Sequence, residues 1–274
     1  MKKIIRKLVE VNITWKVLNF LYKVFYRFKF EKELIEIERA QSKLRSKEEK
    51  LRIRFKDLVV KHGIFAGMRY PDFVAHGSSM FPKLLGSYEC ELYSEIEVLL
   101  KKNYKTIFDV GCAEGYYAVG MALKNPQATI YAFDINAEAL KTCREMATVN
   151  KVDSRMRFED LCSPELLSKF KFTERALIIC DCEGYEAELF TKEVVQNLKN
   201  CDLLIEVHDL YDEKILPSLE DAFHETHGIE LVYSQNTYKK MKDFFPEEKF
   251  SDEEIKTFFI ERNGIMQWAL ITAK

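Results

Sequence analysis

The sequence predicts an α/β protein in which seven strands form a mostly parallel sheet with helices on both faces. Beyond Ser87, short runs rich in β-branched and aromatic residues alternate with longer helical stretches, which is the pattern of βαβ units. The chain has 274 residues, of which 47% are hydrophobic, so it can bury a large core. These two observations favour one large domain with an additional segment before it.

The expected elements follow one another in a regular order. Helices are expected near 88–103, 115–124 and 137–150, and strands at 106–111, 129–135, 156–160, 176–182, 202–208, 229–234 and 266–273. We expect residues 63–105 to form a connecting hairpin or loop and an approach helix, and residues 106–274 to form the main domain. An insertion at 236–264 precedes the last strand, and it either covers the pocket or forms a solvated pair of surface helices.

Residues 1–62 are expected to form a helical extension, beginning with a basic amphipathic helix. Charged residues interrupt its apolar stripe, which excludes a signal peptide and a membrane span; they are Arg6, Lys7, Glu10 and Lys16. Two interpretations stay open for this helix. It lies on an anionic membrane surface as a peripheral contact, or it packs on its own domain or on a second subunit.

From Glu31 onward the extension becomes a charged helix with a heptad-like pattern. Apolar residues occupy a and d positions, but Gln41 and Glu48 interrupt the seam, which argues against a long coiled coil. We therefore expect an antiparallel helical hairpin or a dimer arm, so that residues 1–60 provide either a membrane contact or a homodimer contact.

The overall charge and the cysteines limit the classes of function. The 42 Lys and Arg residues nearly balance the 44 Asp and Glu residues, so the net charge of −2 gives no general attraction for nucleic acid. The seven cysteines are odd in number and show no C-x2-C zinc spacing, which is typical of reduced thiols. We expect a cytoplasmic protein, located at the inner face of the membrane if its first helix binds lipid.

The segment TIFDVGCAEGYYAVG, residues 106–120, ends the first expected strand in a glycine loop. A dinucleotide fingerprint would place its third glycine at Tyr116, so the loop departs from that motif. Asp109 and Glu114 lie close to the loop, where they would repel phosphates but suit an ammonium or sulfonium group. Gly111 and Gly115 allow a tight turn and a close approach of the backbone to a ligand.

Two further strand ends complete this ligand site. Asp134 follows the next strand, 19 residues after Gly115, where its carboxylate can accept hydrogen bonds from both hydroxyls of a ribose. Asp160 and Leu161 follow the third strand and are placed to bind an adenine amino group and to pack against its ring. Together these features describe a positively charged adenosine compound without phosphates, which is S-adenosylmethionine.

The loop also resembles motif I of the Rossmann-like class I methyltransferases, and this resemblance implies the same cofactor. The residues expected to bind it are Glu89, Asp109, Gly111, Cys112, Ala113, Glu114, Gly115, Tyr116, Asp134, Ile135, Asp160, Leu161 and Asp181.

Residues 106–210 resemble the FkbM-like methyltransferases through the run Asp181-x-Glu183-Gly184-x-Glu186 and the pair Glu206-x-His208. This resemblance implies O-methylation of a sugar, a glycan or a related hydroxylated small molecule. The upstream segment LLGSYECEL is similar to the approach segment of related methyltransferases, which would place Tyr88 and Glu89 near the amino-acid end of the cofactor.

Asp181, Glu183, Glu206 and His208 are the expected catalytic residues. They follow or end neighbouring parallel strands, so their side chains point into one crevice. His208 is the candidate general base, with Glu206 or Asp181 orienting it or the acceptor. A competing interpretation is that Asp181, Glu206 and His208 bind Mg²⁺ or Mn²⁺, which would lower the pKa of an acceptor hydroxyl.

Three other functions are alternatives to this one. Nucleic-acid methylation would require a proline-aromatic motif after the fourth strand, where the chain has DCEGYE instead. An NAD-dependent oxidoreductase would keep the fold and change the ligand. A non-catalytic module would bind S-adenosylmethionine without transferring its methyl group.

Overall fold

A computed structural model describes residues 22, 25–36, 39, 49–209, 212–247, 249–261, 264 and 266–274. The chain divides into two units, Met1–Lys56 and Asp57–Lys274. In the first unit, residues 25–36 and 49–54 are helical, and Phe25 and Phe28 are largely exposed. Most of the predicted basic helix and part of the predicted hairpin lie outside the described residues, so the membrane and dimer contacts stay predictions. Among the helices that the structure describes, none is both long and apolar enough to cross a bilayer.

The second unit contains a seven-stranded sheet in the order β3-β2-β1-β4-β5-β7-β6. The strands are β1 (Thr106–Val110), β2 (Thr129–Phe133), β3 (Met156–Glu159), β4 (Ala176–Cys180), β5 (Cys201–Val207), β6 (His227–Tyr233) and β7 (Gln267–Ala273). The first five strands pair in parallel, and β7 lies antiparallel between β5 and β6. The mostly parallel Rossmann-like sheet that the sequence predicts is thereby confirmed.

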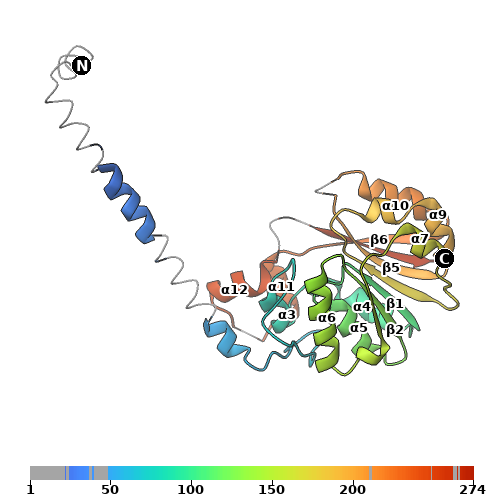
Figure 1. Cartoon of the computed structure of the whole chain (residues 1–274), viewed down its shortest axis with the longest axis horizontal. Helices are drawn as coiled ribbons and strands as arrows, with labels where there is room; N and C mark the ends of the chain where they lie inside the picture. Colours follow the sequence, from blue (N-terminus) through green and yellow to red (C-terminus); the bar gives the residue numbers. More distant parts are fainter. Residues whose placement is uncertain are drawn as a thin grey trace, which may run out of the picture. The chain divides into compact units, whose positions relative to one another are not determined.

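Helices cover both faces of this sheet, as Figure 1 shows. One layer holds α4 (Tyr93–Leu100), α5 (Tyr116–Lys124) and α6 (Ala137–Val149), and the other holds α7 (Pro164–Lys169), α8 (Glu186–Leu189), α9 (Lys192–Asn197) and α10 (Ile215–Phe223). Because both faces are covered, every residue of β4 and β5 is buried. The carboxyl ends of the five parallel strands therefore meet at one edge of the sheet, where loops rather than helices lie.

Capping residues in the sequence determine where several helices begin. Asn136 accepts hydrogen bonds from the backbone of Glu138 and Ala139 at the start of α6. Ser251 forms a capping box with Glu254 at the start of α12 (Asp252–Phe259). These side chains accept from backbone N–H groups that have no partner within the helix, so the loops before the helices keep a defined geometry.

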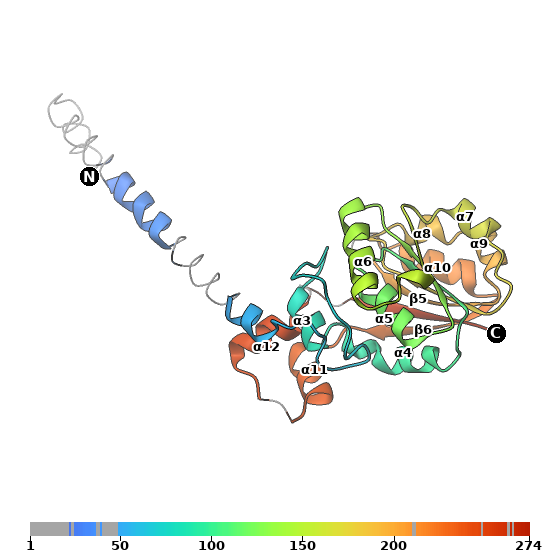
Figure 2. The same cartoon turned by 60° about the horizontal axis from the view of Figure 1, so that its bottom comes forward.

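A third group of helices lies beside the sheet. It consists of α3 (Met80–Leu85), η1 (Cys90–Leu92), α11 (Thr237–Phe244) and α12, and Figure 2 shows α3, α11 and α12 next to one another. The predicted insertion supplies α11 and α12, which pack on each other, while α12 also packs on α3. Ser87 donates a buried hydrogen bond to the carbonyl of Phe258. The insertion is therefore fixed to the segment that leads into the sheet.

Candidate active site

The loop after β1 requires glycine at two positions. Gly111 has φ +81°, and a Cβ atom there would lie 1.7 Å from the carbonyl oxygen of Asp181. Gly115 has φ +100°, and a Cβ atom would lie 2.6 Å from the sulfur of Cys143. Side chains are excluded by both the backbone conformation and the available space. The loop can therefore pass directly beside the end of β4, which brings the β1 and β4 ends of the sheet together.

Asp134 fixes the same loop from the end of β2. Its Oδ2 accepts a hydrogen bond of 2.8 Å from the backbone of Ala113, and its Oδ1 accepts one of 2.8 Å from Asn136. A carboxylate oxygen can accept more than one hydrogen bond, so each oxygen keeps capacity for a hydroxyl of a ligand. The strand-end position that the sequence predicts for Asp134 is the position it occupies.

Asp109 is buried near the end of β1. Burial is the largest influence on this carboxyl, and it raises the pKa of Asp109 to about 8 despite a hydrogen bond from the backbone of Ala118. Its Oδ2 atom has no hydrogen-bond partner within the described part of the chain. Asp109 lines the cavity at the ends of the parallel strands, so this buried acceptor is available to a donor or a positive charge brought by a ligand.

Glu114 is fully buried, and its carboxylate is already bound within the protein. Lys83 contacts its Oε1 at 2.5 Å, and the backbone N–H of His76 donates to Oε2 at 2.9 Å. Glu114 is not among the residues that line the cavity, whereas Lys83 and His76 are. Its carboxylate therefore attaches the segment 76–83 to the glycine loop. Lys83, which the sequence analysis did not identify, balances one of the two negative charges attributed to that loop.

One cavity of about 1090 Å³ lies over the carboxyl ends of the parallel strands. This volume exceeds the usual range for a single small ligand, so it can hold a cofactor and an acceptor together. It is lined by predicted cofactor residues, namely Asp109, Gly111, Cys112, Ala113, Tyr116, Asp134, Ile135, Asp160, Leu161 and Asp181.

The cavity fits S-adenosylmethionine at its adenosine end. The side chains of Ile135 and Leu161 are 83% and 52% exposed, although both are apolar. They line the cavity next to Asp134 and Asp160, where a purine ring could cover them. Apolar surface beside two carboxylates suits a ligand with an aromatic base and hydroxyl groups.

A histidine and four carboxyl groups meet where β4 and β5 end and α8 begins. His208 directly follows β5, and its Nδ1 lies 2.7 Å from Oε1 of Glu186 at the start of α8. Both side chains are buried. Burial acts to raise the pKa of Glu186, but the hydrogen bond from His208 and the charge of that ring outweigh it, so the pKa lies below its ordinary value. An ionised Glu186 can only accept a hydrogen bond, so Nδ1 carries the proton and Nε2 faces the remaining carboxylates.

The other three predicted catalytic residues surround Nε2 of His208. The distances from Nε2 to carboxylate oxygens are 3.5 Å for Asp181, 3.6 Å for Glu183 and 3.9 Å for Glu206. The predicted convergence of these strand-end side chains is therefore present. Asp181, Glu183, Glu206 and His208 all line the cavity.

Burial and charge act in opposite directions on His208. Burial lowers the pKa of its imidazole because the charged form loses hydration. The hydrogen bond to Glu186 and the nearby carboxylates outweigh burial, so the pKa of His208 lies above its ordinary value. The site is thus arranged to stabilise a proton on this ring.

Asp181, Glu206 and His208 also have the geometry of a cation site. One potential ligand atom from each lies within 4.8 Å of the others. Two carboxylates and an imidazole are suitable ligands for a divalent cation such as Mn²⁺. This is the set that the sequence analysis named for Mg²⁺ or Mn²⁺.

Glu89 and Glu186 lie in surroundings that the sequence did not predict. Glu89 is buried and accepts a hydrogen bond from Tyr117, and it is not among the residues lining the cavity. Glu186, rather than Asp181 or Glu206, contacts Nδ1 of His208. The spacing Asp-x-Glu-Gly-x-Glu contains Glu186, but only the turn at Gly184, with φ +106°, directs it back toward the histidine.

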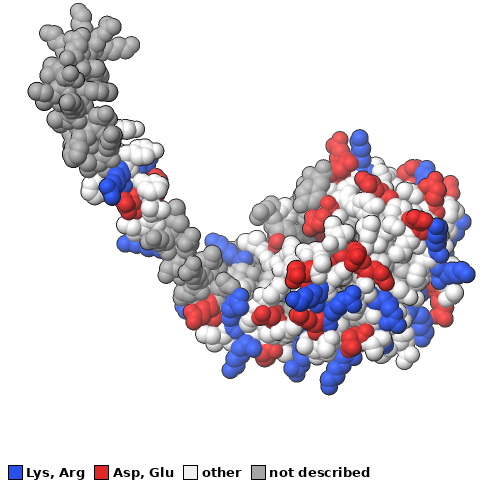
Figure 3. Space-filling view, viewed as in Figure 1, with Lys and Arg blue, Asp and Glu red and all other residues white. Residues whose placement is uncertain are grey.

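Surface charge is mixed on the face drawn in Figure 3, where positive and negative side chains of the described residues are interspersed. This pattern agrees with the small net charge of the sequence.

Comparison with known proteins shows the family to which this chain belongs. The family described as "Methyltransferase domain" matches residues 100–243, which is more than half of the chain. Two release factor glutamine methyltransferases are similar over shorter stretches. The protein from Dictyoglomus turgidum is 32% identical over 77 residues, covering 27% of each chain. The protein from Flavobacterium psychrophilum is 28% identical over 110 residues, covering 38% of this chain and 37% of the relative.

The matched part thus spans 27% of one curated relative and 37% of the other. Among solved structures, a precorrin-6y C5,15-methyltransferase from Geobacter metallireducens has a TM-score of 0.42 at 16% identity. That alignment covers 64% of this chain and 88% of the other.

Proposed function

We propose that this chain, which belongs to the methyltransferase domain family, transfers a methyl group from S-adenosylmethionine to a hydroxyl oxygen of a sugar, glycan or related small metabolite. The supporting observation is His208, a buried base at the cavity wall whose Nδ1 contacts Glu186 while Nε2 faces the cavity. An alcohol is a weak nucleophile until its proton leaves, and a positioned base accelerates that step by about 10²- to 10⁴-fold.

When bound, S-adenosylmethionine supplies an electrophilic methyl group, and its C–S bond breaks as the new C–O bond forms. Asp134 would accept hydrogen bonds from the ribose, and Ile135 and Leu161 would cover the adenine. Nε2 of His208 would take the proton of the acceptor hydroxyl, and the carboxylates around Nε2 would stabilise the resulting imidazolium. Since the cavity has room for both partners, their alignment contributes much of the rate.

The same histidine nitrogen could serve in a different way. Asp181, Glu206 and His208 would hold a divalent cation, which would supply Lewis-acid activation of the hydroxyl. Nδ1 is engaged by Glu186, so Nε2 can be either a base or a metal ligand but not both at once. Activity that survives a chelator would favour the base; activity lost to a chelator and restored by Mn²⁺ or Mg²⁺ would favour the cation.

Ligand binding separates this proposal from an oxidoreductase. Calorimetry should show that S-adenosylhomocysteine binds the wild-type protein and that NAD does not. The glycine loop supports this expectation, because Tyr116 stands where a dinucleotide fingerprint would have its third glycine. Tight binding of NAD, with none of S-adenosylhomocysteine, would overturn the proposal.

Methyl transfer itself tests the role of His208. Labelled S-adenosylmethionine would be supplied with a panel of sugars, amino sugars and polyols, and with a glutamine-containing peptide because the curated relatives are named for glutamine methylation. His208→Asn should retain cofactor binding and lose transfer by about 10²- to 10⁴-fold. The matched control is His224→Asn, since His224 is exposed and its ring lies beside the carbonyl of Asp221 and the carboxylate of Glu225.

Equal transfer rates in wild type and His208→Asn would refute the catalytic assignment. Cofactor binding without transfer to any acceptor would instead favour a non-catalytic module, and methylation of the peptide alone would correct the acceptor class.

A further inference from the structure

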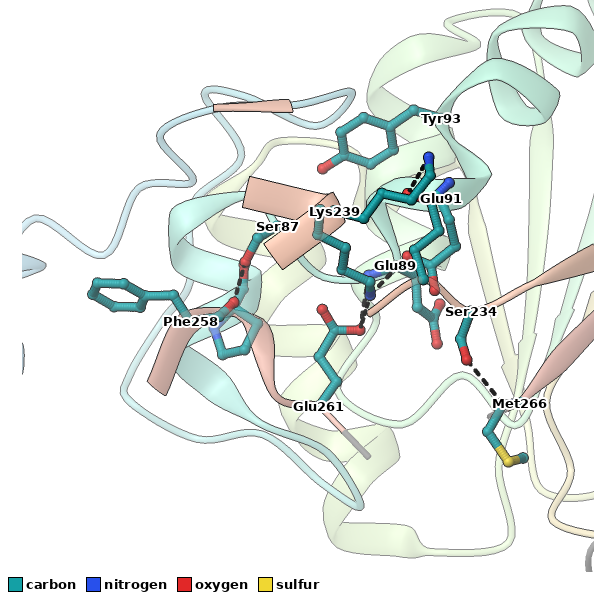
Figure 4. A network of polar contacts seen from close by, with 12 residues as sticks. Ser87, Glu89, Glu91, Tyr93, Ser234, Lys239, Phe258, Glu261 and Met266 are labelled. Atoms are coloured by element: carbon teal, nitrogen blue, oxygen red, sulfur yellow. Dashed lines mark hydrogen bonds and ion pairs between the residues drawn. The ribbon is translucent and has the colours of Figure 1, made fainter. Parts of the chain in front are cut away.

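A second group of buried charges lies at the part of the cavity formed by the 236–264 segment. Lys240 of α11 is 3% exposed at its side chain, and its Nζ lies 2.7 Å from Glu91 and 2.9 Å from Glu261. The backbone N–H of Glu89 also donates to Oε2 of Glu261, at 3.2 Å. Figure 4 shows Glu261 directed from the segment after α12 toward Glu89 and Glu91. The ammonium group of Lys240 is therefore engaged within the protein.

The two carboxylate oxygens of Glu261 have different surroundings. Oε2 accepts from Lys240 and from the backbone of Glu89. Oε1 is buried and has no hydrogen-bond partner within the described residues. The Glu261 side chain is only 5% exposed, yet the residue lines the cavity. A buried acceptor without a partner is costly, so this oxygen is suited to a donor that a ligand brings.

The charges around Glu261 favour a positively charged donor. Glu89, Glu91 and Glu261 bring three carboxyl groups to one buried region, and Lys240 is the cation that contacts two of them. Burial, with the charges of Glu91 and Glu89, raises the pKa of Glu261 to about 8, against the effect of Lys240. Lys83, another lysine that lines the cavity, is paired with Glu114. Carboxyl groups therefore outnumber the lysine in this region, which favours a ligand that brings a positive charge.

Aromatic side chains add to this preference. Tyr88, Tyr116 and Tyr117 line the same cavity. The faces of such rings attract ammonium groups, and the Nζ of Lys83 already lies 4.7 Å from the centre of the Tyr88 ring. A cation entering beside Glu261 would meet both carboxylate and ring surface.

We propose that Glu261 anchors a binding site for an alkylammonium group at the end of the cavity formed by the 236–264 segment. Two ligands of the proposed reaction can carry such a group: the amino-acid end of the cofactor, or an amine on the acceptor. The inference deepens the proposed function by naming the group that the site recognises. The shared chemistry is an N–H donor with a positive charge, bound by Oε1 of an ionised Glu261.

Glu261→Gln is the decisive variant. Glutamine keeps an oxygen to accept from Lys240 and from Glu89, and Lys240 keeps Glu91, so the fold should be retained, as thermal unfolding would verify. The cavity side then carries a neutral amide. Glu247→Gln, an exposed position of the same segment, is the matched control.

Two calorimetric comparisons distinguish the sources. The first uses S-adenosylhomocysteine and 5′-deoxy-5′-methylthioadenosine, which lacks the amino-acid part. If the cofactor supplies the ammonium, Glu261→Gln weakens S-adenosylhomocysteine roughly 10- to 100-fold and leaves methylthioadenosine unchanged. The second uses glucosamine and glucose on protein saturated with S-adenosylhomocysteine. If the acceptor supplies the ammonium, only glucosamine is weakened by the substitution.

Proton release gives an independent measurement. At pH 7 the carboxyl group of Glu261 is largely protonated, and a bound ammonium group would cause it to lose that proton. Calorimetric titrations in buffers of different ionisation enthalpy should therefore show release of about one proton on ligand binding to wild type. Glu261→Gln should release none. The proposal is overturned if Glu261→Gln changes neither the affinity for S-adenosylhomocysteine nor the affinity for glucosamine by more than about twofold. If neither S-adenosylhomocysteine nor methylthioadenosine bound to the wild-type protein, the proposed function would be contradicted instead. Binding of glucosamine and glucose would then be compared on wild type and Glu261→Gln without S-adenosylhomocysteine.

Discussion

Replacing Glu186 by glutamine should lower the pKa of His208 by about one to two units. The pair is buried, with side chains 0% and 4% exposed, and the two atoms are 2.7 Å apart. A hydrogen bond to a charged group contributes about 1.5–3 kcal/mol, and one pKa unit corresponds to about 1.4 kcal/mol. Glutamine keeps the shape of the contact but removes the charge. Burial, which is already the largest single influence on His208 and favours the neutral imidazole, then meets less opposition.

The measurement is NMR titration of the histidine ring signals in the presence of a chelator, so that no cation competes for Nε2. The chain has five histidines, and the signal missing in His208→Asn identifies the relevant one. Glu188→Gln, an exposed position in the same helix α8, is the control. The acid limb of the pH–rate profile should move to lower pH in Glu186→Gln, because the base stays neutral at more acidic pH.

An unchanged or higher His208 pKa in Glu186→Gln would refute this account. It would mean that the carboxylates around Nε2, rather than the contact at Nδ1, control protonation of the ring.

Two further predictions concern buried charges near the glycine loop. Lys83→Met leaves the fully buried Glu114 without its cation and should lower the free energy of unfolding by about 3–5 kcal/mol, whereas adding Glu114→Gln should recover much of that loss. Urea denaturation of the single and the double variant at pH 7 would test this prediction. A loss below about 1 kcal/mol in Lys83→Met would contradict it. Asp109 has a folded-state pKa near 8, above its value in the unfolded chain, so its ionisation costs stability as pH rises toward 8. Release of this one proton should lower the free energy of unfolding by about 2 kcal/mol between pH 6 and pH 8. Asp109→Asn should remove that part of the pH dependence of stability in ligand-free protein. An identical pH dependence of stability in wild type and Asp109→Asn would argue against a raised pKa.

The strand-end residues were accessible from the sequence because their positions follow from local periodicity. Parallel strands separated by helices must end at one edge of the sheet, so the order of the elements alone predicts that Asp134, Asp181 and His208 lie at that edge. The glycines of the first loop were predictable for a similar reason, since a tight turn beside a neighbouring strand admits no Cβ atom.

The pairing of buried charges was not accessible in this way. Lys83 and Glu114 are 31 residues apart, and Glu91 and Lys240 belong to different segments of the chain. Nothing in the local pattern distinguishes Lys240, which is buried, from Lys239, which pairs with Asp243 on the surface. Each charge acquires its partner only when the segments pack.

By itself the sequence determined the alternating fold, the glycine loop and the edge of the sheet at which polar side chains gather. Only the tertiary structure decided that Glu186 holds His208, that Lys83 balances Glu114, and that Glu261 keeps a buried oxygen toward the cavity. The physical reason is that periodicity and turn preference act between near neighbours in the chain, whereas burial of a charge must be compensated by whichever group packing brings within reach.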